Sequence, residues 1–403
     1  MSRLLVAIAL LFLSAAHADE PQWLKDARAR EGQPAVPVSL KSKDGWFTAR
    51  IPYPVTGDVV KEQDSYTINF NLGADTPMQC EIVPDGFDMA DRLSRTLEVT
   101  VSRLEKAQGK VEQRQLDYTD AGAMGNVPYL ESRWLIRVND GKESRVGGLK
   151  QIALEKYGHG IYCAHFDIGF VKSFHEVAHA LAETFEAPPV SPPPYYVEIS
   201  TASIDGRKIG VTITRLEQDK RNATKATQLT ALLLPGTAGV LHTQDALRVD
   251  WIKQDGSLLN ASQTVAQDGE LITDAELNRT SSGWSIHGKV QGSTLALELP
   301  ASAEPASWVS QARARRILLT SGSPIGVVNS VNLWTPPALD GLTTAKTRVL
   351  ARTGPDRFTA HATSGTIEAD LTLDAKTGMP TSIDYPMGDL KIHVERVFAS
   401  GNF

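Results

Sequence analysis

The sequence predicts an α+β N-terminal domain joined to an all-β C-terminal domain. Three observations support this. Two segments with helical periodicity occur before residue 187, a cluster of five prolines interrupts the chain at 187–194, and beyond it Gly-containing turns separate many short strand-like segments. The length of 403 residues also exceeds what one hydrophobic core usually serves, so two domains are expected.

The N-terminus has the features of a secretory signal. Arg3 precedes an unbroken apolar run over 4–13, and Ala16 and Ala18 offer small residues for cleavage. A run of ten residues is too short to span a bilayer. We therefore predict a signal peptide at 1–18 and export, most simply to a bacterial periplasm. No later stretch reaches eighteen apolar residues, so no transmembrane segment is expected after removal of the signal.

Composition limits the partners. The net charge of −6 and the absence of a long basic block argue against nucleic acid. Cys80 and Cys163 are the only two cysteines, and export favours a disulfide between them. Closing a loop of this length stabilises by roughly 4 kcal/mol in the chain-entropy model. The alternative is two separate buried thiols.

In the N-terminal half, the sequence predicts a flexible lead-in at 19–35 followed by a domain at 36–186. Short strands separated by turns are expected up to residue 83. A helix should follow, because apolar residues recur near every 3.6 positions and a glycine ends the series: Met89, Leu93, Leu97, Val101, Leu104 and Gly109. Strands are then expected at 110–120, 127–138, 145–157 and 160–167, and a closing helix at about 169–186.

This order of elements, opened by the strand that begins Gly45-Trp46-Phe47, resembles the PsbP-like family, which includes the DcrB-like envelope proteins. The resemblance covers roughly residues 36 to 186. It implies an αβα sandwich with two main helices and a non-enzymatic accessory or binding role.

The Pro-rich segment 187–194 is expected to be a stiff linker, and 195–403 an all-β domain. An irregular or partly helical crossing is expected at 300–311. Strands are predicted on both sides of it, at 195–203, 207–216, 226–235, 246–253, 262–266, 270–277, 283–289, 293–299, 315–320, 329–334, 346–352, 356–362, 366–373, 380–385 and 389–397.

With no long helix among these strands, a curved antiparallel sheet or half-barrel is expected. Its layout, with turns at 255–258 and 374–380, is similar to the LolA-like envelope carriers. That resemblance implies an apolar concave face able to take an acyl chain or a peptide. Four tryptophans of this half are either core residues or a ligand platform: Trp251, Trp284, Trp308 and Trp334.

One string has the spacing of a zinc hydrolase. His175 and His179 stand four residues apart and face the same side of the expected helix, so both could bind zinc while Glu176 acts as general base. Against this, no third ligand follows at the spacing that zincins use, and the prolines end the helix early. Glu198 has the sequence distance but falls in an expected strand. His159 and His165 could complete a site, or could simply be packed.

The resulting prediction is a non-catalytic binding or accessory protein of the envelope, without a cofactor, that holds a lipid, a peptide or a partner protein. The alternative is a zinc-dependent hydrolase with His175 and His179 as ligands and Glu176 as base. No phosphate-binding glycine loop and no nucleophile elbow occurs in the sequence.

Overall fold

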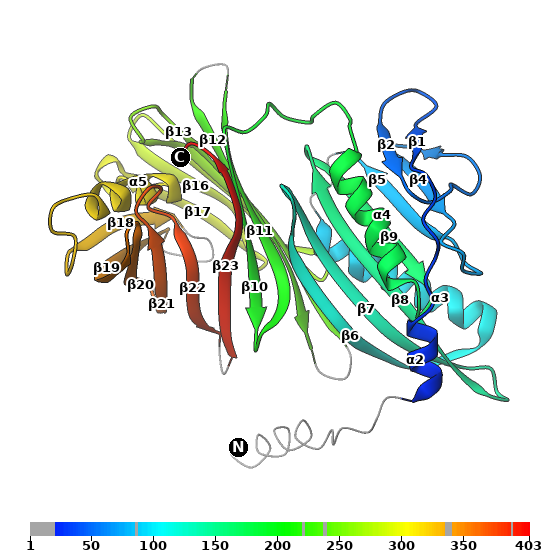
Figure 1. The fold of residues 1–403 in the computed structure, drawn as a ribbon. Coiled ribbons are helices and arrows are strands. Elements are labelled where there is room, and N and C mark those ends of the chain that lie inside the picture. The colour runs from blue at the N-terminus through cyan, green and yellow to red at the C-terminus, as the bar shows by residue number, and fades with distance from the viewer. Residues whose placement is uncertain (1–20, 85–87, 220–221, 237–239, 335–340, 388–389) are drawn as a thin grey trace, which may run out of the picture.

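Two large antiparallel sheets stack against each other in this protein (Figure 1). The computed structural model describes residues 21–403 apart from 85–87, 220–221, 237–239, 335–340 and 388–389. The signal peptide predicted at 1–18 lies outside the described residues. Part of the expected lead-in forms the short helix α2 (Gln22–Arg28). None of the described helices is long and apolar enough to cross a membrane.

The first sheet has seven strands. A separate hairpin of β1 (Val38–Lys41) and β2 (Thr48–Ile51) lies beside it. The order of the seven strands is β3 (Val60–Glu62), β4 (Ser65–Phe70), β5 (Met78–Val83), β9 (His159–Phe166), β8 (Ser144–Lys156), β7 (Val127–Asn139) and β6 (Lys110–Met124).

Helix α4 (Val171–Thr184) covers one face of this sheet. Strand β4 shows why the face is apolar, since Tyr66, Ile68 and Phe70 alternate with less buried residues. Helix α4 turns Phe174 and Leu181 toward the same core. The opposite face of the sheet is also buried, so it needs a second layer.

That second layer is helix α3 (Met89–Gln108) together with the other sheet. Leu93 and Leu97 of α3 share one apolar cluster with Trp134 of β7 and with Val211 and Leu229 of the second sheet. The two sheets therefore bury a common core, with α3 filling one side of the space between them.

The second sheet has fourteen strands. Their order is β17 (Ser293–Pro300), β16 (Gly283–Val290), β15 (Glu270–Arg279), β14 (Leu258–Gln267), β13 (Leu241–Ile252), β12 (Thr224–Pro235), β11 (Arg207–Gln218), β10 (Tyr196–Ile204), β23 (Leu390–Gly401), β22 (Pro380–Met387), β21 (Ile367–Asp374), β20 (Arg357–Ser364), β19 (Leu342–Gly354) and β18 (Val328–Trp334). The chain runs outward through β10–β17, the first limb. It returns through β18–β23, the second limb, so that the last strand pairs with β10.

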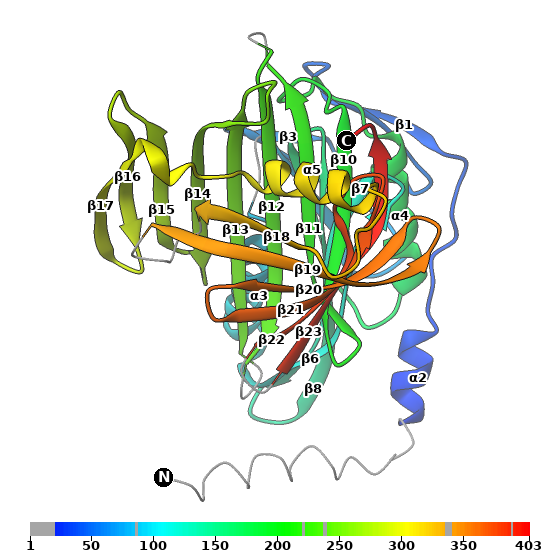
Figure 2. The same cartoon turned by 90° about the vertical axis from the view of Figure 1, so that its left-hand side faces the viewer.

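The sheet bends so that the second limb crosses in front of the first (Figure 2). Bulges interrupt its ladders between β10 and β23, within β19–β20 and within β21–β22, and bulges increase local twist.

In the chain, η2 (Ala301–Ala303) and helix α5 (Trp308–Leu319) connect the first limb to the second. Gly378 follows β21 and has a φ of +70°; a Cβ there would come within 1.9 Å of the Ala312 carbonyl oxygen, so only glycine fits this close approach.

The predicted fold class is wrong. The described chain is mostly β, and the seven-stranded sheet does not belong to a helix-containing α+β sandwich, because one of its faces is stacked on the fourteen-stranded sheet. The apolar periodicity correctly identified buried faces, but it does not tell whether a helix or a second sheet buries them. The two helices expected in the first half do form, as α3 and α4.

The contact between α3 and the second sheet predicts a pH effect. Asp245 of β13 accepts hydrogen bonds from the backbone N–H groups of Ala90 (3.1 Å) and Asp91 (2.9 Å) at the start of α3. Burial, with a contribution from the Asp88 and Asp91 carboxylates, raises the pKa of Asp245 to about 7 although these N–H groups lower it. Between about pH 4 and 7 the folded state keeps a proton that the unfolded state has released, so stability falls as pH rises through this window.

We expect Asp245→Asn to remove this part of the pH dependence, while the exposed Asp274→Asn leaves it intact. The measurement is urea unfolding of the three proteins from pH 4 to 8. Superimposable pH profiles for the wild type and Asp245→Asn would contradict the assignment.

Candidate functional site

The proposed zinc-binding string lies on α4, where His175 and Glu176 already interact with other side chains. His175 Nε2 lies 2.9 Å from Glu131 Oε2 and 3.3 Å from Arg133 Nη2. Glu176 Oε2 accepts a hydrogen bond of 2.6 Å from the Tyr53 hydroxyl. His179 is exposed. The carboxylate that would activate a water is thus held by a tyrosine, and one histidine is held by a buried carboxylate.

The other candidate ligands lie elsewhere. His159 Nε2 contacts the Pro188 carbonyl oxygen at 2.8 Å, and His165 Nε2 contacts the Thr76 carbonyl oxygen at 3.2 Å. Glu198 lies in β10 of the second sheet. Within the described part of the chain, no group of three or more His, Cys, Asp or Glu side chains is arranged to hold a metal ion.

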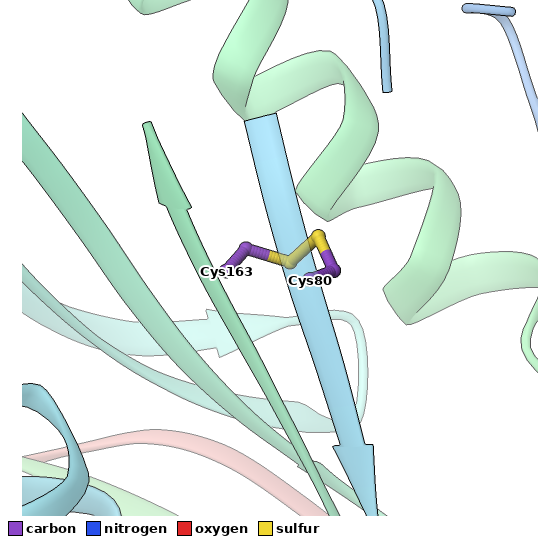
Figure 3. Close-up of a disulfide and its surroundings, with 2 residues drawn as sticks. All are labelled: Cys80 and Cys163. Carbon is purple, nitrogen blue, oxygen red and sulfur yellow. A yellow bond between two sulfur atoms is a disulfide. The ribbon is translucent and has the colours of Figure 1, made fainter. Parts of the chain in front are cut away.

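The two cysteines form a disulfide (Figure 3). Cys80 in β5 and Cys163 in β9 are directly opposite residues of adjacent strands, and both are buried in the core under α4. The bond therefore fastens two central strands of the first sheet. It offers no free thiol for chemistry, since both cysteines are paired.

The strongest candidate for a functional site is a cavity of about 440 Å³ inside the bend of the fourteen-stranded sheet. We call it the sheet cavity. Residues of β10–β12 form one wall, residues of β18–β23 form the other, and α5 contributes Trp308, Gln311 and Arg315. These three positions, i, i+3 and i+7, lie on one face of the helix, and that face lines the cavity.

The two walls differ chemically. The wall from the first limb is hydroxyl-, amide- and carboxyl-bearing, with Glu198, Ser200, Thr212, Thr214, Gln228 and Thr230. The wall from the second limb is mixed. It adds aliphatic groups, among them Leu333, Ala345, Leu371, Met379, Ile383 and Val394, beside polar groups such as Lys346, Thr347, Thr363 and Ser364. An apolar concave face was expected from the LolA-like resemblance, and one wall of the cavity departs from that expectation.

Strand alternation explains the polar wall. In β11, Val211 and Ile213 face the first sheet and are buried there, so Thr212 and Thr214 between them face the sheet cavity. Strand β12 repeats this pattern with Leu229 packed on the first sheet. In the middle of the fourteen-stranded sheet, one face therefore packs against the first sheet and the other face lines the sheet cavity.

Arg315 stands out among the groups that line the cavity. Its exposed fraction is only 6%, and its guanidinium has no ion pair or hydrogen bond with any described residue. Burial lowers its pKa to about 10, which leaves it charged at neutral pH. A buried and unpaired charge is costly, so its position needs an explanation.

The second guanidinium of the cavity shows the ordinary arrangement. Arg396 of β23 pairs with Asp374 Oδ2 at 2.9 Å and with Glu198 Oε2 at 3.3 Å. Tyr196 donates a further hydrogen bond of 2.7 Å to Glu198 Oε2. This group is neutralised by its own chain, whereas Arg315 is not.

A second cavity of about 420 Å³ lies beside the proline segment that connects the two sheets. Arg215 pairs with Glu155, and Glu217 accepts a hydrogen bond from Ser191 and lies near Lys225. Lys156, which also lines this cavity, donates to the carbonyl oxygens of Ala182 and Glu183. Each of these charged groups thus has a partner among the described residues, unlike Arg315.

Most of α5, and with it Arg315, was not predicted from the sequence. An irregular or partly helical crossing was expected at 300–311 and a strand at 315–320, but residues 308–319 form one helix, so the predicted strand is wrong. A signal was present: Ser307 caps the helix by accepting from the Ser310 N–H at 2.9 Å, and Ala and Arg residues that favour helices follow. Trp308, considered as either core or platform, lines the cavity.

Comparisons with known proteins give structural similarities only. No family model and no curated protein matches it. Among solved structures it is similar to a β-barrel-like protein of the domain of unknown function DUF1849 from Brucella abortus, with 10% identity and a TM-score of 0.38 over 51% of this chain and 97% of that chain. A DUF1089 family protein from Pseudomonas aeruginosa gives 16% identity and a TM-score of 0.27 over 49% and 91%. Scores this low carry no argument about function, and the PsbP-like and LolA-like resemblances are not confirmed: the chain is a β-rich protein.

Proposed function

We propose that this chain is an exported, non-catalytic binding protein that holds a small amphipathic ligand in the sheet cavity. The observation that carries the proposal is the cavity itself, about 440 Å³ between two limbs of one sheet and under α5. This volume lies within the range of about 300–1,000 Å³ typical of small-molecule sites.

The chemistry of the walls supports a ligand with two unlike sides. The first limb presents polar groups to the cavity, and two further polar atoms of lining residues, Trp308 Nε1 and Thr347 Oγ1, are buried without a hydrogen-bond partner among the described residues. Buried polar groups need partners. A ligand with hydrogen-bonding groups and an apolar surface would match the polar first wall and the aliphatic part of the second wall.

A binding role fits the site better than catalysis. The cavity carboxylate, Glu198, is held by Tyr196 and Arg396 in a fixed ion-pair and hydrogen-bond network. Outside the cavity, Glu176 is similarly occupied by Tyr53. General base catalysis needs a carboxylate that faces a substrate, and these two face side chains of their own chain.

Export is supported by two independent features. The N-terminal sequence has the charged, apolar and small-residue regions of a signal peptide. The disulfide between Cys80 and Cys163 is a bond that oxidising compartments favour. The ligand would then be a molecule of the cell envelope, such as a lipid or a peptide.

Filling the cavity tests the proposal. Ala345 of β19 is buried and lines the sheet cavity, whereas Ala351 of the same strand is exposed. We expect the neutral fluorophore N-phenyl-1-naphthylamine to bind the wild type at one site and to lose at least tenfold in affinity in Ala345→Phe. Ala351→Phe should bind as the wild type does.

Overpacking costs about 1–3 kcal/mol, so each variant is first checked for its thermal unfolding transition. Ala362→Phe, which also narrows the cavity, provides a second variant if Ala345→Phe does not fold. Unchanged fluorophore binding in a folded cavity-filling variant, or no binding by the wild type, would exclude the sheet cavity as the site.

A further inference from the structure

We propose that the sheet cavity recognises an oxyanion, a carboxylate or phosphate carried on an apolar body, and that Arg315 binds it. This inference rests on the proposed function and specifies the ligand. Its basis is that Arg315 is 6% exposed, lines the cavity and has no anionic partner among the described residues.

The cost of this arrangement is the first step of the argument. A guanidinium taken out of water without a counter-charge destabilises the folded protein, and mutations that remove such a group are often stabilising. The same cavity contains Arg396, which is paired with two carboxylates. The fold therefore provides counter-charges for one cavity arginine and leaves the other for a partner from outside.

Neighbouring donors point to the same chemistry. Trp308 Nε1 and Thr347 Oγ1 are buried polar atoms without a hydrogen-bond partner in the described structure, and both residues line the sheet cavity with Arg315. The indole N–H can only donate, and so can the guanidinium. An oxyanion is rich in acceptor oxygens, so it can accept hydrogen bonds from donors of this kind, and it also neutralises the charge.

The charge balance of the cavity is compatible with an anion. Arg396 is paired with both Glu198 and Asp374. Arg315 and Lys346, which also line the cavity, add two positive charges. Counting these five groups as ionised leaves one net positive charge. Bringing in one monoanion would make the site neutral, and a positive cavity favours entry of anions.

The aliphatic part of the second wall indicates what carries the oxyanion. Leu333, Leu371 and Ile383 give the second limb an aliphatic surface beside the donors. A free inorganic anion would leave that surface uncovered, whereas an acyl chain or a short apolar peptide with a free carboxylate would cover it. These two sources share the oxyanion chemistry and differ in their body.

The experiment uses probes that share a body and differ in the head group. Dodecanoate, dodecyl phosphate, dodecanol and dodecyltrimethylammonium are titrated below their critical micelle concentrations into the mature protein, with displacement of a cavity fluorophore as the readout. The peptide arm compares N-acetylated trileucine with a free or an amidated C-terminus. We expect the anionic form of at least one body to bind 10- to 100-fold more tightly than its neutral form, because charge-assisted hydrogen bonds contribute about 1.5–3 kcal/mol.

Arg315→Met is the main variant, and Arg313→Met is its control on the same helix with the same change in charge. Arg313 does not line the sheet cavity. We expect Arg315→Met to lose the preference for the anion while it keeps the affinity for the neutral probe, and Arg313→Met to behave as the wild type does. Arg315→Lys should recover part of the preference.

Thermal unfolding supplies a readout without any ligand. The Tm of ligand-free Arg315→Met should rise by about 2–4 °C, since an unpaired buried charge is removed. A purely structural arginine would give a lower Tm in the same variant. A falling Tm would therefore contradict the proposal even where probe binding is weak.

The outcomes separate the two proposals. Equal affinities for anionic and neutral probes in the wild type would contradict the oxyanion proposal but not the proposal that the sheet cavity binds a ligand. Equal losses for both head groups in Arg315→Met would assign Arg315 a packing role only. Failure of every probe to bind the folded wild type would overturn both proposals.

Discussion

Replacing Arg215 by methionine is expected to lower the free energy of unfolding by about 3–5 kcal/mol. Arg215 lies in β11 of the second sheet, and its guanidinium pairs with Glu155 of β8 in the first sheet. The Glu155 side chain is completely buried. Its carboxylate would remain in the interface without its counter-charge, and removing one partner of a buried pair costs more than the pair itself contributes.

A double-mutant cycle distinguishes this from a loss of packing. Glu155→Gln keeps an oxygen to accept the hydrogen bond from the Gly158 N–H, which is 2.7 Å long, and removes the charge. We expect Glu155→Gln with Arg215→Met to be clearly more stable than Arg215→Met alone, as measured by urea unfolding. Additive losses would mean that the two charges do not interact.

Another ion pair between the sheets serves as the matched control. Lys208 of β11 lies 3.2 Å from Asp120 of β6, but both side chains are partly exposed, at 45% and 21%. Exposed pairs contribute about 0–1 kcal/mol, so Lys208→Met should change stability by no more than that. A loss comparable with that of Arg215→Met would show that any link between the sheets, buried or not, is equally important.

The local elements of the first half could be predicted from the sequence because their patterns are complete over many residues. The stripe Met89, Leu93 and Leu97 spans more than two turns and identified α3, and Gly109 marked its end. The long strands β6 to β9 begin and end within a few residues of the predicted ranges. In these segments the local sequence pattern alone predicts the secondary structure, and tertiary contacts do not change it.

The stacking of the two sheets could not be read in the same way. Val211 and Leu229 are apolar at alternate positions, which indicates a buried face but not its partner. That partner is the first sheet, whose last strand, β9, ends 45 residues before Val211 in the chain. The α+β sandwich was wrong because it assigned to helices a face that a second sheet covers.

The candidate site was the least predictable part. The short string at 175–179 matched a known pattern, yet in the fold Glu176 contacts Tyr53, and His175 contacts Glu131. Arg315 belongs to no pattern, because its interest lies in the lack of a partner among the described residues. Only a three-dimensional arrangement can tell whether a charge is paired.

Removing the disulfide is expected to cost about 4 kcal/mol of stability. Cys80 and Cys163 are 83 residues apart, and their bond restricts the unfolded chain over that whole length. Both side chains are buried, so a variant must also preserve packing. We therefore propose Cys80→Val with Cys163→Ala, compared by urea unfolding with the oxidised wild type and with wild type reduced by dithiothreitol.

The variant and the reduced wild type should lose similar amounts of stability, because both lack the covalent link. Equal midpoints for oxidised and reduced wild type would contradict the prediction.

The same bond also tests export. In cells, the full chain should contain no thiol that reacts with maleimide, whereas a chain that lacks residues 1–18 should retain two in the reducing cytoplasm. Since the linked strands β5 and β9 lie at the centre of the first sheet, the cytoplasmic form should also be the less stable one.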